Sequence, residues 1–165
     1  MKDIIDDGVK HSIAHDAELV TWDEHFVIGI ELMDNQHKEL VKLTNQLYYA
    51  CLAGNDVIAQ AFKEAMSQMV EYVRFHFSVE AELMKRVNFP EYNEHKAQHD
   101  LLVKQILTAA SEFQSGKKIA ANNFVRTLKD WIFGHIAVYD KSYAAFIVKQ
   151  KAKGLLTDKQ LQGNG

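Results

Sequence analysis

The sequence contains eight histidines, and five of them, together with two carboxylates, fall where helical periodicity predicts an inward-facing side chain. These seven residues are His37, His76, Glu80, His95, His99, His135 and Asp140. A buried polar group without a partner costs about 1–3 kcal/mol, and a buried carboxylate costs more. Imidazole and carboxylate are both ligands of transition metals. The set therefore predicts a metal centre rather than isolated core histidines.

Composition narrows the class of protein. The chain has 165 residues, 47% hydrophobic and 25% charged, as expected for one globular domain. A net charge of −3 gives no support for nucleic acid as a partner. The first residues lack the apolar core of a secretory signal, and no apolar run reaches the roughly 18–20 residues of a membrane segment. The single cysteine, Cys51, excludes an internal disulfide and a thiolate zinc cluster, so we expect a cytoplasmic protein.

Helical periodicity, a single proline and glycines between the periodic segments predict four helices joined by short turns. The expected helices cover about 34–54, 56 to the Asn88–Pro90 turn, 91–116 and 118–150. Asp34 is the expected N-cap of the first helix. Short connections place consecutive helices antiparallel, so the predicted fold is all-α, an up-down-up-down antiparallel four-helix bundle with an N-terminal arm.

The chain is predicted to have three parts. They are an N-terminal arm at 1–33, the bundle at 34–150 and a polar C-terminal tail at 151–165. Apolar residues of the arm are expected to hold it to the bundle; these are Trp22, Phe26, Val27 and Ile30.

The bundle topology predicts that the metal-binding candidates meet. His37 lies near the beginning of the first predicted helix and His76 near the end of the second, and these two ends coincide in antiparallel neighbours. His95 and His99 lie at the beginning of the third helix, at that same end. His135 lies past the middle of the fourth helix. All four helices thus bring imidazoles toward one level of the interior.

The number of candidate ligands predicts two metal ions. Seven groups are too many for one ion, since a structural zinc site takes four. If Glu80 and Asp140 both bridge, the five histidines divide three and two between the ions. With a solvent-derived bridge, one ion then has six ligands and the other five, so one coordination position stays open. Imidazole and carboxylate without thiolate suit iron, although manganese, cobalt or zinc could also occupy such a site.

Four stretches of the sequence carry a family resemblance. The stretch that begins at Trp22 ends in an Asp-x-Gln-His signature at Asp34, Gln36 and His37. The others are HFSVEAELM at 76–84, FPEYNEHKAQH at 89–99 and WIFGHIAVYDKSY at 131–143. In this combination the chain resembles the hemerythrin family, in particular its single-domain bacterial form, the bacteriohemerythrins. The resemblance covers roughly residues 22–147.

The resemblance implies a non-haem di-iron centre with an oxo or hydroxo bridge that binds dioxygen. It implies that His95, His99 and His135 hold the coordinatively saturated iron, that His37 and His76 hold the other, and that Glu80 and Asp140 bridge them. Dioxygen would bind to the two-histidine iron, taking two electrons from the iron pair and a proton from the bridging hydroxide. It leaves by the reverse route.

Ile132, one turn before His135, is expected to line the apolar wall of the dioxygen pocket. The family commonly has leucine at this position. The predicted function is reversible dioxygen binding for carriage, storage or delivery, without enzymatic turnover and with no assigned protein partner. Two alternatives stay open: an oxygen or redox sensing module, and a di-iron oxidase or peroxidase.

The spacing of two candidate ligands does not fit a regular helix. His135 and Asp140 are five residues apart, which is about 140° around an ideal α-helix. Either the helix widens to a π-type turn near 136–139, or the two side chains reach the metals from opposite edges of the inward face.

Several polar residues have more than one interpretation. His11 and His15 could form a metal-binding pair on a helical arm or lie at a solvated surface. Asp34 and Gln36 could cap the first helix or orient a ligand imidazole. Tyr139 and Tyr143 could donate hydrogen bonds near the ligands or serve in core packing.

Overall fold

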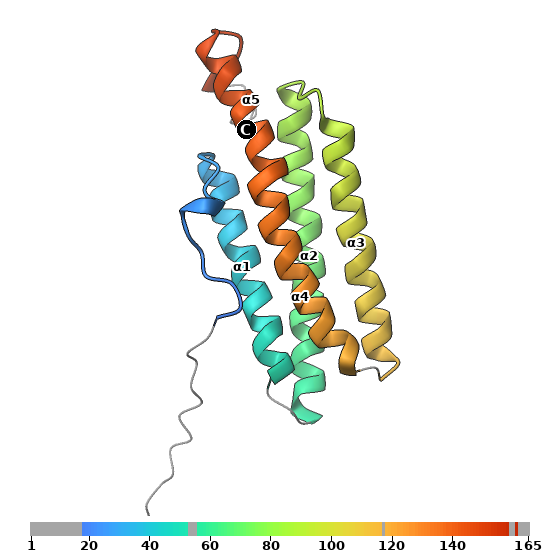
Figure 1. Ribbon diagram of the computed structural model, residues 1–165. Helices are drawn as coiled ribbons and strands as arrows, with labels where there is room; N and C mark the ends of the chain where they lie inside the picture. The colour runs from blue at the N-terminus through green and yellow to red at the C-terminus, as the bar shows by residue number, and fades with distance from the viewer. Residues whose placement is uncertain (1–17, 53–55, 117, 159–160, 162–165) are drawn as a thin grey trace, which may run out of the picture.

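The computed structural model describes residues 18–52, 56–116, 118–158 and 161. Its elements are a short 3₁₀ helix η1 (Glu24–Phe26), α1 (Glu31–Leu52), α2 (Asp56–Arg86), α3 (Tyr92–Gln114), α4 (Lys118–Gly134), a π-helical segment η2 (His135–Asp140) and α5 (Lys141–Ala152). α4, η2 and α5 follow one another without a break and form a single long rod (Figure 1).

The four rods form an antiparallel bundle (Figure 1). α1 packs against α2 and α4, and α3 packs against the same two helices, so each rod has two neighbours. The predicted four-helix bundle is confirmed. No helix in the described part of the chain is long and apolar enough to cross a membrane.

The core consists of two apolar layers with the polar candidates between them. On every rod the same order occurs: residues of the smaller cluster, then the polar side chains, then residues of the larger cluster. On α1, for example, His37 lies between Met33 and Leu40. On α3, His99 lies between Tyr92, which packs against the smaller cluster, and Leu102. The polar level is therefore closed on both sides by hydrophobic packing, and this positions the site.

The segment before α1 is fixed to the bundle through two side chains of that helix. The amide of Asn45 pairs with both backbone groups of Val20, at 3.0 and 2.8 Å. The carboxylate of Asp34 accepts the N–H groups of Ile28 and Gly29, at 2.8 and 3.1 Å. Because α1 begins at Glu31, Asp34 lies inside the helix, and its prediction as the N-cap was wrong.

The expected apolar anchors of the arm behave differently from one another. Phe26 is buried against Trp22 and Phe133, with ring centroids 5.4 and 4.6 Å apart. Ile30 is half-buried against the smaller cluster. Val27 is 44% exposed, so its prediction as an anchor was wrong. η1 ends at Phe26, and only that side chain of the short helix turns inward.

The described residues after α5 make both apolar and polar contacts with the bundle. Leu156 is buried in the smaller cluster with Leu83, Met84 and Ile147. The side chain of Arg86 donates to the carbonyl oxygen of Leu161 at 3.0 Å. The described part of the predicted tail therefore folds back onto the end of α2, next to the polar level.

Candidate metal centre

All seven predicted ligands converge at one level and are buried, none being more than 4% exposed. Two groups share a member: Glu80, His95, His99, His135 and Asp140 form the first, and His37, His76 and Glu80 form the second. Within each group the potential ligand atoms lie within 4.8 Å of one another. The predicted meeting of four helices at one level is thus what the structure contains.

Three imidazoles form a compact triangle. The Nε2 atoms of His95 and His99 are 3.1 Å apart, those of His99 and His135 are 2.9 Å apart, and those of His135 and His95 are 3.2 Å apart. Nitrogens at right angles around a metal ion, about 2.1 Å from it, lie about 3.0 Å apart, whereas tetrahedral ligands lie about 3.4 Å apart. The triangle therefore fits three neighbouring positions of a six-coordinate ion.

Asp140 faces both groups of histidines. Its Oδ1 lies 3.0 Å from Nε2 of His135 and 3.3 Å from Nε2 of His95. Its Oδ2 lies 3.2 Å from Nε2 of His37, which belongs to the other group. The two oxygens of one carboxylate are thus directed to two sets of nitrogens, as a bridging ligand requires.

Glu80 is placed in a similar way. Its Oε2 lies 3.1 Å from Nε2 of His99 and 3.4 Å from Nε2 of His95. The same oxygen lies 3.9 Å from Nε2 of His76, one turn earlier on α2. Glu80 is therefore the residue common to both groups.

Many polar atoms of this cluster have no hydrogen-bond partner. They include both ring nitrogens of His37, both carboxylate oxygens of Glu80 and of Asp140, and Nδ1 of His95 and His135. Protein interiors rarely leave buried polar atoms unpaired, because each costs about 1–3 kcal/mol. Cations would compensate most of them at once, so the donor set fits a pair of metal ions.

The pKa values of the cluster show how its charges interact. Burial alone would raise the pKa of Glu80, but the neighbouring rings of His95 and His99 lower it to about 2. Burial lowers the pKa of His76 to about 4. Burial alone would also lower the pKa of His95, but Asp140 and Glu80 raise it to about 9. The pKa of Asp140 is lowered as well, so both carboxylates are ionised and the ring of His76 is neutral, which are the states that bind metal, whereas His95 would release a proton on binding an ion.

One cluster imidazole is oriented by a neutral side chain. Nδ1 of His76 lies 2.9 Å from Oε1 of Gln36, and Tyr72 donates to the backbone oxygen of Gln36 at 2.9 Å. An amide oxygen only accepts, so Nδ1 of His76 carries the proton and its Nε2 lone pair faces the cluster. Of the two roles open to Gln36, the structure contains the contact with a ligand imidazole.

The fourth rod widens at the candidate ligands. Residues His135–Asp140 are π-helical, and the N–H of Lys141 reaches the carbonyl oxygen of Ile136. A π turn holds one residue more than an α turn, so it brings two side chains five positions apart onto one face. The expected π-type widening is confirmed, and with it one of the two alternatives for His135 and Asp140.

Aromatic rings enclose the three-histidine group. Phe77 stacks on His99, with centroids 3.6 Å apart and an interplanar angle of 3°. Trp131 and Tyr139 stack on His135 at 4.2 and 5.3 Å. Neither Phe77 nor Trp131 was predicted as part of the site. The i,i+4 spacing of Trp131 and His135 could have indicated that pair, whereas the contact of Phe77 with His99 joins two helices.

The remaining candidates are placed as follows. Ile132 is fully buried in the larger apolar cluster, one turn before His135. Tyr143 is fully buried, its hydroxyl has no hydrogen-bond partner, and burial together with the charges of Glu80 and Asp140 raises its pKa. Both alternatives for Tyr143 therefore stay open, since its ring packs in the core and its hydroxyl lies near the carboxylate of Glu80. His11 and His15 lie outside the described residues.

Comparison with known proteins shows which family this chain resembles. Residues 28–147 match the family model described as "Hemerythrin HHE cation binding domain". The bacteriohemerythrin of Stenotrophomonas maltophilia (strain R551-3) is 32% identical over 127 residues, which are 76% of this chain and 80% of that protein. The bacteriohemerythrin of Pseudomonas aeruginosa (strain LESB58) is 30% identical over 145 residues, which are 84% of this chain and 92% of that protein.

Solved structures of hemerythrin resemble this chain in fold. The crystal structure of wild-type hemerythrin superposes with a TM-score of 0.69 at 26% identity, covering 77% of this chain and 96% of that chain. The crystal structure of a hemerythrin point mutant superposes with a TM-score of 0.70, covering 78% and 97%. The family match covers most of the chain and includes all four segments that carry the cluster. The chain therefore belongs to the hemerythrin family.

Proposed function

We propose that this chain binds dioxygen reversibly at a non-haem di-iron centre and serves in its carriage, storage or delivery. The observation that carries the proposal is the unequal division of the cluster. Three imidazoles surround one position and two surround the other, while both carboxylates lie between them. One ion would then have one protein ligand fewer than its partner, and a small ligand could occupy the position that is left.

The ligand assignment is part of this proposal. His95, His99 and His135 would hold one iron, and His37 and His76 would hold the other. Glu80 and Asp140 would bridge them. The mutual 2.9–3.2 Å spacing of the first three nitrogens supports the first group. The contact of Asp140 with both groups supports the bridge.

The chain's own residues would make the binding reversible. When bound, a ferrous pair would supply the electrons that reduce dioxygen and would recover them on its release. The two carboxylates would offset part of the positive charge of the iron pair, whereas the five imidazoles are neutral and would offset none of it. The positive charge that is left favours the reduced metal. The apolar layers, with Ile132 and Ile136 fully buried, exclude the water that would assist irreversible oxidation.

Anaerobic reconstitution tests the proposal. The metal-free protein is loaded with ferrous iron, dioxygen is admitted, and dioxygen is then removed. We expect two irons and one dioxygen per chain, with a visible absorption band that appears with dioxygen and disappears on its removal over repeated cycles. Permanent conversion to a ferric form would contradict the proposal. Sustained consumption of an added reductant with dioxygen or peroxide would favour a di-iron enzyme, and a single irreversible oxidation would favour a redox sensor.

Two histidine variants form a matched pair for this experiment. His37→Ala removes a fully buried imidazole of the two-histidine group. His25→Ala removes a histidine whose side chain is 89% exposed. We expect only His37→Ala to abolish the reversible band. Equal behaviour of the two variants would contradict the assignment of His37.

A further inference from the structure

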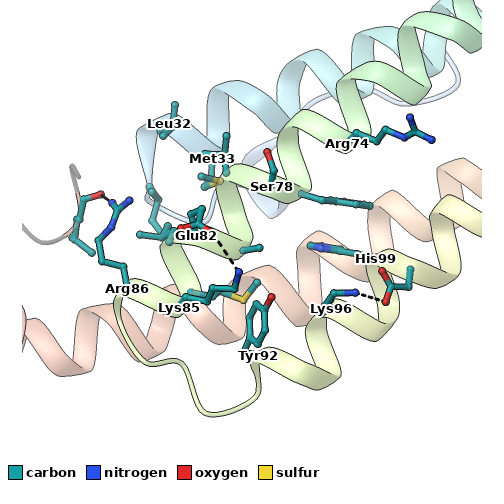
Figure 2. A pocket seen from close by; sticks show the side chains of 18 of the residues that line it. Leu32, Met33, Arg74, Ser78, Glu82, Lys85, Arg86, Tyr92, Lys96 and His99 are labelled. Atoms are coloured by element: carbon teal, nitrogen blue, oxygen red, sulfur yellow. Dashed lines mark hydrogen bonds and ion pairs between the residues drawn. The ribbon is translucent and has the colours of Figure 1, made fainter. Parts of the chain in front are cut away.

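A groove on the surface of the bundle reaches the metal centre from one side. It has a volume of about 1130 Å³ and lies along α2 and α3, and its lining includes Phe77, Ser78 and Glu82 of α2 and Tyr92, Lys96 and His99 of α3. Figure 2 shows His99 between the two helices at this groove, beside Lys96. Of the seven cluster residues, His99 is the one that lines the groove.

His99 is also the most exposed of the seven residues, at 4%, whereas Glu80, Asp140 and His37 are at 0%. The ring of Phe77, which is 8% exposed and also lines the groove, is stacked flat on the imidazole at 3.6 Å. One face of this ligand is thus covered by a single aromatic ring that itself borders the groove.

The other imidazoles are held more firmly. His135 is sandwiched between Trp131 and Tyr139. The remaining three are no freer: His76 is hydrogen-bonded to Gln36, His37 is fully buried, and His95 packs against the other two rings of its triangle and against Tyr143. A metal ion can enter or leave a closed site only if at least one ligand rotates away. His99 has the space to do so, on the side of the groove.

We propose that divalent metal ions enter and leave the centre through this groove, by rotation of His99, and that Phe77 is the gate. The inference rests on the cluster holding metal, as proposed above, but not on dioxygen binding. Two acidic residues of the groove are already paired with lysines, Asp100 with Lys96 and Glu82 with Lys85 (Figure 2). We expect the gate, rather than these carboxylates, to set the rate of exchange.

A gate has a kinetic signature that weakened binding lacks. Removing it speeds entry and exit together and leaves the equilibrium affinity unchanged, whereas loss of a binding contact speeds exit alone. The probe is Co²⁺, with uptake by the metal-free full-length chain and removal by a chelator both followed through the cobalt absorption. We expect Phe77→Ala to speed both rates about tenfold or more, Phe77→Leu to have a smaller effect, and the dissociation constant to change less than about threefold.

Phe62→Ala is the matched control. Phe62 is equally an interior phenylalanine, 1% exposed, and packs against Phe113 in the larger cluster, with ring centroids 4.3 Å apart. If metal escapes by general opening of the bundle, Phe62→Ala and Phe77→Ala will accelerate removal alike, and the inference fails. It also fails if Phe77→Ala speeds removal but not uptake. If the wild-type chain takes up no stoichiometric Co²⁺, the proposed metal centre fails and this inference falls with it.

Two further measurements avoid a change in the core. Ser78 is exposed and lines the groove, so Ser78→Trp should slow both uptake and removal, whereas Ser115→Trp, at an exposed serine beyond α3, should not. In the metal-free protein, diethyl pyrocarbonate should modify His99 first among the five cluster histidines, as read by peptide mass spectrometry. Earlier modification of another cluster histidine, or no slowing by Ser78→Trp, would overturn the assigned route.

Discussion

The amide oxygen of Gln36 on α1 lies 2.9 Å from Nδ1 of His76 on α2, and this hydrogen bond links the two helices at the level of the metal centre. The backbone oxygen of Gln36 is held in turn by the hydroxyl of Tyr72. His76 therefore presents Nε2 to the cluster in one fixed tautomer. Nδ1 of His95 and of His135, by contrast, has no hydrogen-bond partner.

Replacing Gln36 with leucine should weaken metal binding. The variant leaves Nδ1 of His76 buried without an acceptor and frees the ring to change tautomer, and loss of such a partner typically costs about 10–100-fold in metal affinity. Competition with a chelator of known affinity measures the change. Gln46→Leu, at an exposed glutamine of the same helix, is the control and should bind as the wild type does. Equal affinity of both variants would exclude an orienting role for Gln36.

Replacing Asp140 with asparagine should reduce the metal content from two ions per chain to one. Asp140 contacts His135 at 3.0 Å and His37 at 3.2 Å through different oxygens, and an amide cannot supply two anionic ligand atoms. The triangle of three histidines keeps Glu80 and should retain its ion. Elemental analysis after anaerobic loading measures the ratio. Asp130→Asn, with a side chain that is 77% exposed on the same rod, should keep two ions; two ions in Asp140→Asn would contradict the bridge.

Deleting Val138 should leave the bundle folded and keep the metal centre. Val138 is 62% exposed in the π-helical segment, and removing one residue from a π turn converts it to an α turn without changing the register of the flanking helices. His135 and Asp140 are then four positions apart, and an α-helix places such side chains about 40° from each other, so both still face the centre. Circular dichroism should show a cooperative unfolding transition close to that of the metal-free wild type, and elemental analysis should find the metal content of the wild type. A folded variant without metal would show that the π turn itself is needed to place the two ligands.

The control is deletion of Leu101, which is 48% exposed in the regular helix α3. That deletion rotates one half of the helix by about 100° against the other and should prevent folding. If the deletion of Val138 unfolds the chain as severely as the deletion of Leu101, the π segment is required for the fold.

The bundle and the convergence of its ligands could be predicted because both follow from local pattern. A histidine on an apolar helix face is ambiguous, but His37, His76 and His99 occupy matching heights once neighbouring helices are antiparallel. The π segment could be narrowed to one of two alternatives for a similar reason, since residues five positions apart, such as His135 and Asp140, do not share one face of an α-helix. The positions of these residues around and along each helix can be read from their spacing in the sequence.

Contacts between elements were less accessible to sequence reasoning. Asp34 has the residue type and position of an N-cap, but its carboxylate instead accepts N–H groups of the preceding loop at Ile28 and Gly29. Phe77 was assigned no role, because its stacking on His99 depends on how α2 and α3 are rotated against each other. The burial of Leu156 depends on the path of the chain after Gly154, which has a positive φ of 70°. Tertiary packing decides all three.

Cys51 should react slowly with alkylating reagents at neutral pH. Burial raises the pKa of its thiol from 9.0 to about 11, so at pH 8 the thiolate fraction is roughly a hundredfold smaller than in an unstructured chain. The rate of iodoacetamide modification in the folded protein should rise with pH up to about 11, whereas the unfolded protein should level off near pH 9. Because the raised pKa favours the protonated thiol in the folded state, this group also removes stability as the pH rises from 9 to 11. Rapid modification of the folded protein at pH 8 would contradict the burial of Cys51.

Replacing Ile132 with alanine should speed irreversible oxidation of the iron centre without changing its metal content. Ile132 is fully buried one turn before His135, and truncation opens space for water beside the ligands. Ile106→Ala is the matched control, since Ile106 is 2% exposed in the same cluster but lies about two turns beyond His99 on α3. Both substitutions should lower the free energy of unfolding by about 2–5 kcal/mol. The half-life of the oxygenated protein, measured at fixed dioxygen and pH, should shorten in Ile132→Ala and stay near the wild-type value in Ile106→Ala. A half-life that shortens equally in both variants would mean that loss of stability, rather than an opened wall, exposes the irons to water.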